Sequence, residues 1–219
     1  RIKAFPWEKL VSKDQTISIR VALNSQTFTH SHFMALKAKD AIVDRIRDKT
    51  GERPDVDLEN SDIPIHIYID KEYITISLDS TGQSLHMRGY RQLTGQAPIN
   101  EVLAAGIVEL SGWDPATPFY DGMCGSGTIA TEAAIKGLNM PPGLFRKFDY
   151  AFQNWPDFNQ ELLDTIIESS MEKISDAPLR IFASDASSNV VSKATGVGTS
   201  PRRLFNALLL ELNELRCFQ

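Results

Sequence analysis

A glycine-rich turn between an expected strand and an expected helix constrains the fold of this chain more than any other segment. The segment DGMCGSGTIATEAA, residues 121–134, places three glycines within six residues and then continues into a helix-forming run. Glycine tolerates the left-handed backbone of tight turns and lets the main chain approach a ligand closely. An apolar strand at 117–121, the turn and a helix at 127–138 therefore predict the start of a parallel α/β sheet.

The residues before this turn predict a different kind of domain. Strands are expected at 17–23, 64–70 and 73–79, where apolar and polar residues alternate, and a helix at 30–51 carries an apolar stripe and ends at a glycine. This order indicates a small α+β domain over residues 1–90. In residues 91–219, expected helices and strands alternate, which indicates an α/β domain. Its first helix, 99–113, is apolar nearly all round, which predicts that it is buried.

The composition is that of an ordinary globular protein. Of the 219 residues 42% are apolar, and no apolar run approaches the length of a membrane span. Cys124 and Cys217 form no disulfide framework and no metal-ligand spacing, so we expect no metal and a cytoplasmic location. Cys124 lies inside the turn and is expected to pack there rather than act as a nucleophile. The first residue, Arg1, indicates a piece of a longer or processed chain.

Several ligands compete for the glycine turn. A phosphate-binding P-loop requires a lysine after its last glycine, and this turn has none. A dinucleotide fingerprint is matched by Gly125, Gly127 and Ala130, and it requires an acid about 20 residues further on, near Asp149. The segment before Asp149, PPGLFRKF, lacks the alternation of a strand. A turn without any ligand is the remaining alternative.

S-adenosylmethionine is a further candidate and uses more of the residues. Asp121 ends the expected strand, where its carboxylate can pair with the ammonium group of the cofactor. Gly125, Ser126 and Gly127 allow close approach of the backbone, and the N-terminus of the next helix suits the cofactor's carboxylate. Asp185 ends the next expected strand, where it can accept hydrogen bonds from the ribose hydroxyls.

The turn and three other segments carry a resemblance to a known family. DGMCGSGTIATEAA resembles the cofactor loop of the THUMP-containing class I RNA methyltransferases, whose usual form is DPMCGSGT followed by an IEAA-like helix. The other segments resemble the family in the same order: KAKDAIVDRIRDKTGERPDVD, SLDSTGQSLHMRGYRQLTGQAPINEVLAAGIVELSGW and PPGLFRKFDYAFQNW. The family comprises bacterial 23S rRNA guanine-N2 methyltransferases and relatives often labelled N6-adenine-specific DNA methylases. The resemblance covers residues 15–195.

The resemblance implies an RNA-binding THUMP domain in residues 1–90, followed by a Rossmann-like class I methyltransferase domain. It implies transfer of a methyl group from S-adenosylmethionine to large-subunit ribosomal RNA, expected at guanine N2. Carried over residue by residue, it implies that Asp185 holds the ribose and that Pro98, in the APINE segment, packs over the cofactor. The implied pocket is lined by Asp121, Gly125, Ser126, Gly127 and Thr128.

The chain departs from the family in two places. Gly122 stands where the family has proline, which loosens the turn and raises the entropy lost on ordering it. The family's NPPY motif, which contacts the target amine and stacks on the flipped base, is absent, so no catalytic residue is assigned. From residue 195 the resemblance ends, and we expect a truncation or an altered reading frame there. The partial domain is expected to self-associate through an uncovered sheet edge or its C-terminal tail.

Two groups of residues are candidates for contacts with ribosomal RNA. On the helix at 30–51, Lys37 and Lys39 can reach phosphates, although acids at 40, 44 and 48 favour a salt-bridged solvent face. In the acid-free arm at 85–92, Arg88 and Arg91 can bind phosphate and Tyr90 can stack on a base. The alternative for this arm is a linker whose arginines dock the two domains.

Two other functions compete with RNA methylation. Without NPPY, the chain can be a non-catalytic fragment that binds RNA and cofactor. A nicotinamide-dependent oxidoreductase is the second alternative, and it predicts that Asp149 rather than Asp185 binds the ribose.

Overall fold

Packing divides the chain into two units, of which the computed structural model describes residues 2–90 and 99–186. Unit 1 consists of Arg1–Ser84 and Asp149–Gln160, and unit 2 consists of Leu85–Phe148 and Glu161–Gln219. One boundary near Tyr90 was expected. The packing instead divides the chain between residues 84 and 85, and residues 149–160 return to unit 1. The domain limits 1–90 and 91–219 stay a prediction.

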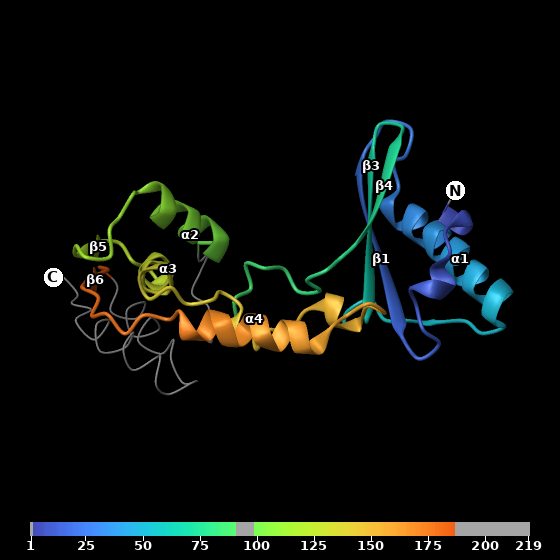
Figure 1. Ribbon diagram of the computed structural model, residues 1–219. Helices are drawn as coiled ribbons and strands as arrows, with labels where there is room; N and C mark the ends of the chain where they lie inside the picture. The colour runs from blue at the N-terminus through green and yellow to red at the C-terminus, as the bar shows by residue number, and fades with distance from the viewer. Residues whose placement is uncertain (1, 91–98, 187–219) are drawn as a thin grey trace. The chain divides into compact units, whose positions relative to one another are not determined.

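Unit 1 is built on a four-stranded sheet with one long helix (Figure 1). Two short 3-10 helices, η1 (Ile2–Ala4) and η2 (Trp7–Lys9), come first. The other elements are β1 (Thr16–Asn24), α1 (Ser31–Thr50), β2 (Asp55–Val56), β3 (Ile63–Asp70) and β4 (Tyr73–Leu78). The strand order is β2-β1-β3-β4, with β1 parallel to β2 and β3, and β3 antiparallel to β4. This is the α+β arrangement expected from the alternating strands.

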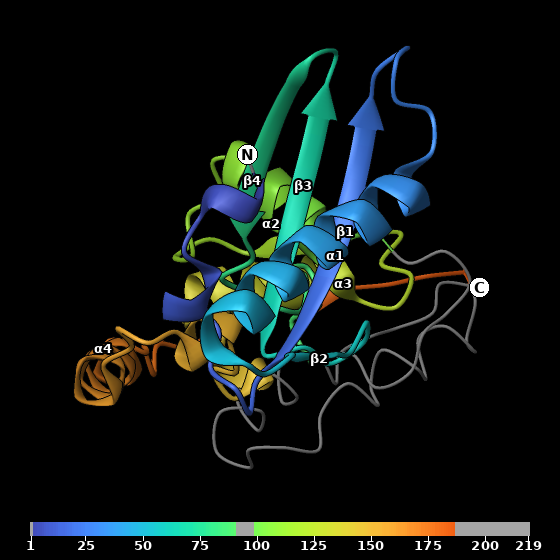
Figure 2. The ribbon, with the colours of Figure 1, turned by 90° about the vertical axis from the view of Figure 1, so that its right-hand side faces the viewer.

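The core of unit 1 forms between α1 and one face of this sheet (Figure 2). The period-two pattern of β3 places its four isoleucines on this face, and α1 supplies its apolar stripe from the other side. Burial of each such isoleucine contributes roughly 1.5–3 kcal/mol. The helix ends at Gly51, whose left-handed φ of 83° lets its N–H donate to Arg47 O at 2.8 Å.

Residues 149–160 belong to unit 1 although they follow much of unit 2 in the chain. They include η4 (Ala151–Asn154), and Phe152 N donates to Ser80 O at 3.1 Å. Gln15 Nε2 donates to Asn154 O at 2.8 Å, and Trp155 packs against the core. Nothing in the hydrophobic pattern predicts this return, because the contacts join residues that are far apart in sequence.

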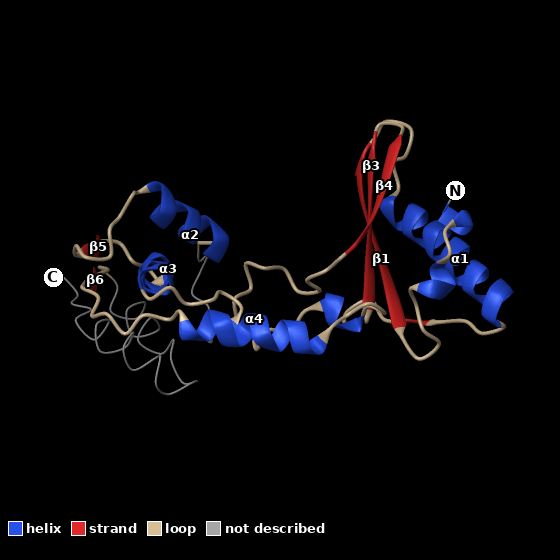
Figure 3. Ribbon diagram, in the orientation of Figure 1, coloured by secondary structure: helices blue, strands red, loops and turns tan. Residues whose placement is uncertain are grey.

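Unit 2 contains two short parallel strands, coloured red in Figure 3, and several helices. Its elements are α2 (Glu101–Leu110), β5 (Phe119–Asp121), α3 (Thr128–Gly137), η3 (Leu144–Arg146), α4 (Gln160–Glu172, whose first residue belongs to unit 1) and β6 (Ile181–Ala183). The core gathers around the alanine-rich face of α3, where small side chains allow close packing against the strands. The expected alternation of helices with parallel strands is present.

Helix α2 is only partly buried, whereas complete burial was expected. Its buried residues are Glu101, Ala104 and Val108, whereas Leu103 is 56% exposed and Leu110 is 90% exposed. One face of α2 packs on α3, so the other face remains an apolar surface on the described part of unit 2. The predicted self-association stays untested, and the tail that was expected to contribute lies outside the described residues.

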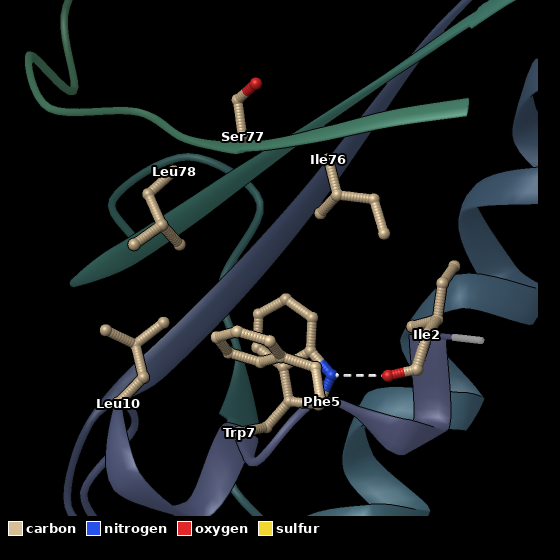
Figure 4. A pocket seen from close by; sticks show the side chains of 7 residues that line it. All are labelled: Ile2, Phe5, Trp7, Leu10, Ile76, Ser77 and Leu78. Carbon is tan, nitrogen blue, oxygen red and sulfur yellow. Dashed lines mark hydrogen bonds between the residues drawn. The ribbon is translucent and has the colours of Figure 1, made fainter. Parts of the chain in front are cut away.

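An apolar pocket of about 200 Å³ opens in unit 1, between the N-terminal 3-10 helices and β4 (Figure 4). The indole of Trp7 donates to Ile2 O at 2.9 Å beside it. The pocket is lined by Ile2, Phe5, Trp7, Leu10, Ile76, Ser77 and Leu78. None of the described residues that line this pocket is charged, so they offer no partner for a charged cofactor.

Candidate functional site

The candidate site lies where the two parallel strands of unit 2 end. β5 and β6 pair with Asp121 opposite Ala183, so both strands end at the same edge of the sheet. Asp121 is the last residue of β5, and Asp185 follows the last residue of β6 by two positions. The N–H of Gly125 donates to Asp185 Oδ2 at 2.9 Å, across 60 residues of sequence. The structure therefore brings together the glycine turn and the two acids that the sequence singles out.

The glycine turn has a backbone that few residues other than glycine tolerate. Gly125 has a φ of +55° and Gly127 a φ of +78°. Gly127 is the N-cap of α3, and its N–H donates to Cys124 O at 2.8 Å. No atom lies within 4 Å of the position that a Cβ would take at Gly125 or Gly122. This side of the turn is open and leaves room for a ligand, while Cys124 is buried in the core of unit 2.

Asp121 presents a buried carboxylate oxygen without a hydrogen-bond partner. Its Oδ1 accepts the N–H of Met123 at 3.3 Å, while Oδ2 is buried and makes no hydrogen bond within the described part of the chain. Burial raises the pKa of Asp121; the Met123 N–H lowers it, and the negative charge of Asp185 raises it. A buried carboxylate oxygen in this state is costly. The arrangement therefore suits a cationic group that completes the hydrogen bonding of Asp121.

The charges around the turn fit S-adenosylmethionine. Its ammonium and sulfonium groups are positive, and Asp121 and Asp185 place two carboxylates beside the turn. α3 begins at the turn, and the positive end of its dipole suits the carboxylate of the cofactor. A pyrophosphate would meet the same two carboxylates without a lysine in the turn. The electrostatics thus favour a ligand with positive charge.

Asp149 does not lie at the end of a strand, which is the position that a dinucleotide-binding site requires of its acid. It follows the 3-10 helix η3 and a turn rather than a strand, and it belongs to unit 1. The acid that follows the second strand of unit 2 is Asp185. The expectation that Asp149 binds a ribose therefore loses its basis.

The remaining candidate cofactor residues are placed in part. Ser126 Oγ lies 3.5 Å from Thr128 Oγ1 in the first turn of α3, and Thr128 is buried. Pro98 and the RNA candidate Arg91 lie outside the described residues. No group of three or more His, Cys, Asp or Glu residues that could hold a metal occurs among residues 2–90 and 99–186.

Arg88 and Tyr90 are not part of an exposed arm, which corrects the expectation for them. Tyr90 is 5% exposed and its hydroxyl donates to Glu132 Oε1 at 2.9 Å. Arg88 Nε lies 2.9 Å from the same oxygen, and its side chain is 11% exposed. Both residues pack inside unit 2, where they contact the buried carboxylate of Glu132. The buried ring of Tyr90 therefore offers no exposed face to a base.

The lysines of α1 differ in their surroundings. Lys39 Nζ lies 3.2 Å from Asp40, and Arg47 pairs with Asp44 at 3.0 Å, so this part of the helix is a salt-bridged surface. Lys37 is exposed and lies over the ring of Phe33, 5.6 Å from its centroid. Of the two lysines, Lys37 keeps the arrangement that suits an RNA contact.

Sequence reasoning missed Glu132. It lies in α3, one turn after Thr128, and is 2% exposed. The signal available in the sequence is a single acid inside the run IATEAAI, where every other position is apolar or a threonine. An acid in such a run indicates a buried charge with a specific partner.

Comparison with known families matches the two parts of the chain separately. Residues 1–79 match the THUMP domain, and residues 88–196 match UPF0020, described as an RMKL-like methyltransferase domain. No helix within residues 2–90 and 99–186 is long and apolar enough to cross a membrane.

Similar proteins and structures carry related descriptions. A candidate RNA methyltransferase of Synechocystis sp., slr0064, is 42% identical over 196 residues, which cover 88% of this chain and 50% of that protein. A predicted N6-adenine-specific DNA methylase from Listeria monocytogenes has a TM-score of 0.81 at 29% identity over 100% of this chain and 55% of its own. SMU.472, a candidate methyltransferase complexed with SAH, has a TM-score of 0.77 at 28% identity over 100% of this chain and 55% of its own. The chain spans about half the length of these relatives.

Proposed function

We propose that unit 2 binds S-adenosylmethionine and that the protein methylates RNA. The proposal follows from the combination of a THUMP domain with the RMKL-like methyltransferase domain of the UPF0020 family. The observation that carries the proposal is the buried Oδ2 of Asp121 at the glycine turn, which has no hydrogen-bond partner among residues 2–90 and 99–186. In this proposal Asp121 pairs with the ammonium group, and Asp185 accepts the ribose hydroxyls. The first turn of α3, with Gly127, Ser126 and Thr128, meets the carboxylate of the cofactor.

The finer proposal concerns the target. The bound cofactor supplies a methyl group activated by its sulfonium, and transfer to an amine requires that the amine and the methyl carbon be aligned. We propose large-subunit ribosomal RNA, at guanine N2, because the four segments resemble that family, and Lys37 of unit 1 as an RNA contact. This target places the protein in the cytoplasm. The competing proposal is that residues 1–219 bind RNA and cofactor without transferring a methyl group.

Calorimetric titration of the chain with S-adenosylmethionine and, separately, with NAD tests the cofactor. We expect saturable binding of the former only. Asp185→Ala should weaken it roughly tenfold or more, since a hydrogen bond to a charged group contributes about 1.5–3 kcal/mol. A folded chain that binds neither ligand, or that binds NAD, would contradict the proposal. Transfer of labelled methyl to ribosomal RNA then separates an active enzyme from the non-catalytic alternative.

Because burial raises the pKa of Asp121, we expect cofactor binding to release protons at pH values between the pKa of Asp121 in the bound chain and that in the ligand-free chain. In the ligand-free chain burial raises this pKa, whereas a bound ammonium group would lower it. Between the two pKa values binding therefore expels a proton, and affinity falls as the pH is lowered through the raised pKa. Titrations in buffers of different ionisation enthalpy measure the release. Asp121→Asn should abolish it, and an equal release from that variant would assign it to another group.

A further inference from the structure

The sheet of unit 1 has one face that α1 does not cover. α1 packs on the face that holds the buried isoleucines of β3 (Figure 1). The opposite face, called the open face here, carries the even-numbered residues of β1 and β3 and the odd-numbered residues of β4, because side chains alternate along a strand. Its two middle rows are exposed and consist of Arg20, His66 and Ser77, and of Ala22, Tyr68 and Thr75.

The returning segment of unit 1 lies at one end of this sheet. η4 contacts β3, and Phe152 N donates to Ser80 O at 3.1 Å, just after the end of β4. At this end Ser18 and Pro64, which pair on the open face, are buried. The rows beyond them stay exposed as far as the turn between β3 and β4. The open face is therefore a platform of several exposed rows that is closed at one end.

Two tyrosines lie on the exposed part of the open face. Tyr68 is 48% exposed and Tyr73 is 80% exposed. Tyr68 pairs with Thr75 and Tyr73 pairs with Asp70, so the two tyrosines are diagonal neighbours on adjacent strands. Diagonal neighbours lie roughly 7–8 Å apart, within reach of aromatic side chains. The two rings can therefore contact neighbouring parts of one ligand, and exposed aromatic rings are surfaces on which planar bases stack.

The charges of the open face favour an anionic ligand over its middle rows. These rows hold the guanidinium of Arg20 and no carboxylate. Within the described part of the chain, this guanidinium makes one long hydrogen bond, from Nη2 to Leu58 O at 3.5 Å. The carboxylates lie at the margins: Asp79 is 3.3 Å from His66 Nε2 at the closed end, and Asp70 accepts Asn24 Nδ2 at 2.7 Å near the β3–β4 turn. Three further acids, at 55, 57 and 59, follow the β2 edge.

Exposed rings beside a cation suit an unpaired nucleic-acid strand better than a duplex or a protein. The flat face of a base is free to stack only where the base is unpaired and splayed out. A protein partner is less well matched, because the residues between the tyrosines are small or polar. The exposed isoleucines of β4, Ile74 and Ile76, pair with Ile69 and Ile67 and so lie on the other face of the sheet.

We infer that the open face of unit 1 binds an unpaired segment of the RNA, with bases stacked on Tyr68 and Tyr73 and a phosphate at Arg20. The inference rests on the proposal that the protein methylates RNA. It places the stacked bases on the side of the sheet opposite α1, the helix that carries Lys37.

Fluorescence anisotropy of the full chain with a short labelled RNA strand tests this surface. We expect the single strand to bind at least about tenfold more tightly than the same sequence in a duplex. Tyr68→Thr and Tyr73→Thr remove a ring but keep a residue that favours strands, and each should raise the dissociation constant about tenfold. Tyr68→Phe keeps the ring and should bind as the wild type does. Arg20→Gln should lower the slope of log affinity against log salt concentration by about 0.7, the value for one phosphate of a single strand.

Phe33→Ala is the matched control, because Phe33 is 55% exposed but lies on α1 beside Lys37. We expect this variant to keep wild-type affinity. Wild-type affinity in both threonine variants, or equal binding of single strand and duplex, would overturn the inference and leave RNA binding intact. A wild-type chain that binds no RNA would refute the RNA proposal itself, and the inference with it. Photo-crosslinking of the wild-type chain to thiouridine-containing RNA needs no variant: crosslinks within residues 63–78 support the inference, and crosslinks confined to residues 31–50 refute it.

Discussion

We expect Asp121→Asn to weaken S-adenosylmethionine binding by at least about 30-fold, because truncating one partner of a buried charge pair costs about 2 kcal/mol or more. The same change should stabilise the ligand-free chain. Oδ2 of Asp121 is buried and makes no hydrogen bond to any residue that the structure describes, and burial raises the pKa of Asp121. A raised folded-state pKa means that Asp121 contributes stability below its unfolded pKa and loses that contribution as the pH rises through the folded value. At neutral pH the ionised group therefore opposes folding, and a neutral amide removes this effect.

Paired measurements of affinity and melting temperature test this prediction. The matched control is Asp114→Asn in the same unit: Asp114 Oδ1 also accepts the N–H two residues ahead, that of Ala116, at 2.9 Å, but its side chain is exposed. We expect this control to retain wild-type affinity and to gain no stability. A gain on the order of 1 kcal/mol for Asp121→Asn, with loss of binding, would identify a site that exchanges stability for function. Wild-type affinity in Asp121→Asn would remove Asp121 from the cofactor site.

Gly89→Ala should destabilise unit 2 more than any other glycine-to-alanine change at a left-handed position in that unit's described part. The left-handed backbone costs an alanine about 1–2 kcal/mol. At Gly89, with a φ of +88°, the added Cβ would also lie 2.6 Å from Phe145 O, so the backbone of one segment has to move. That displacement adds about 1–3 kcal/mol. We therefore expect a total loss of about 3 kcal/mol.

Gly112→Ala is the control for the backbone term. Gly112 has a φ of +65°, but no atom lies within 4 Å of its Cβ position. We expect a loss of about 1–2 kcal/mol from the backbone alone. Urea denaturation followed by circular dichroism compares the two variants. Equal losses would show that the contact between Gly89 and Phe145 relaxes without cost.

Much of the site was predictable from local sequence. Left-handed turns favour glycine, so Gly125 and Gly127 indicate the turn from sequence alone. Strand pattern places Asp121 and Asp185 at strand ends, and the helix start follows from the run after Gly127. The hydrogen bond from Gly125 to Asp185 was beyond local reasoning, because it joins residues that lie 60 positions apart in the sequence.

The errors share one physical cause. Arg88 and Tyr90 look like an exposed basic arm because the residues around them contain no acid, and their acid, Glu132, is supplied from another helix. Helix α2 looks buried because its composition is apolar, but burial depends on which neighbours a helix face has. Composition describes a segment, whereas burial and charge pairing belong to contacts between segments.

Local sequence predicts the longer strands and helices, the α+β order of unit 1 and the glycines of the turn, because these depend on backbone preference and hydrophobic period over a few residues. Three features follow from tertiary contacts: one buried oxygen of Asp121 has no partner among the described residues, Glu132 pairs with Arg88 and Tyr90, and residues 149–160 return to unit 1. These depend on long-range contacts, whose energies are set by the burial of groups that are distant in the chain. The energetic cost of burying the carboxylates of Asp121 and Glu132 therefore depends on tertiary contacts. Replacing Asp121 gives the best test of the function.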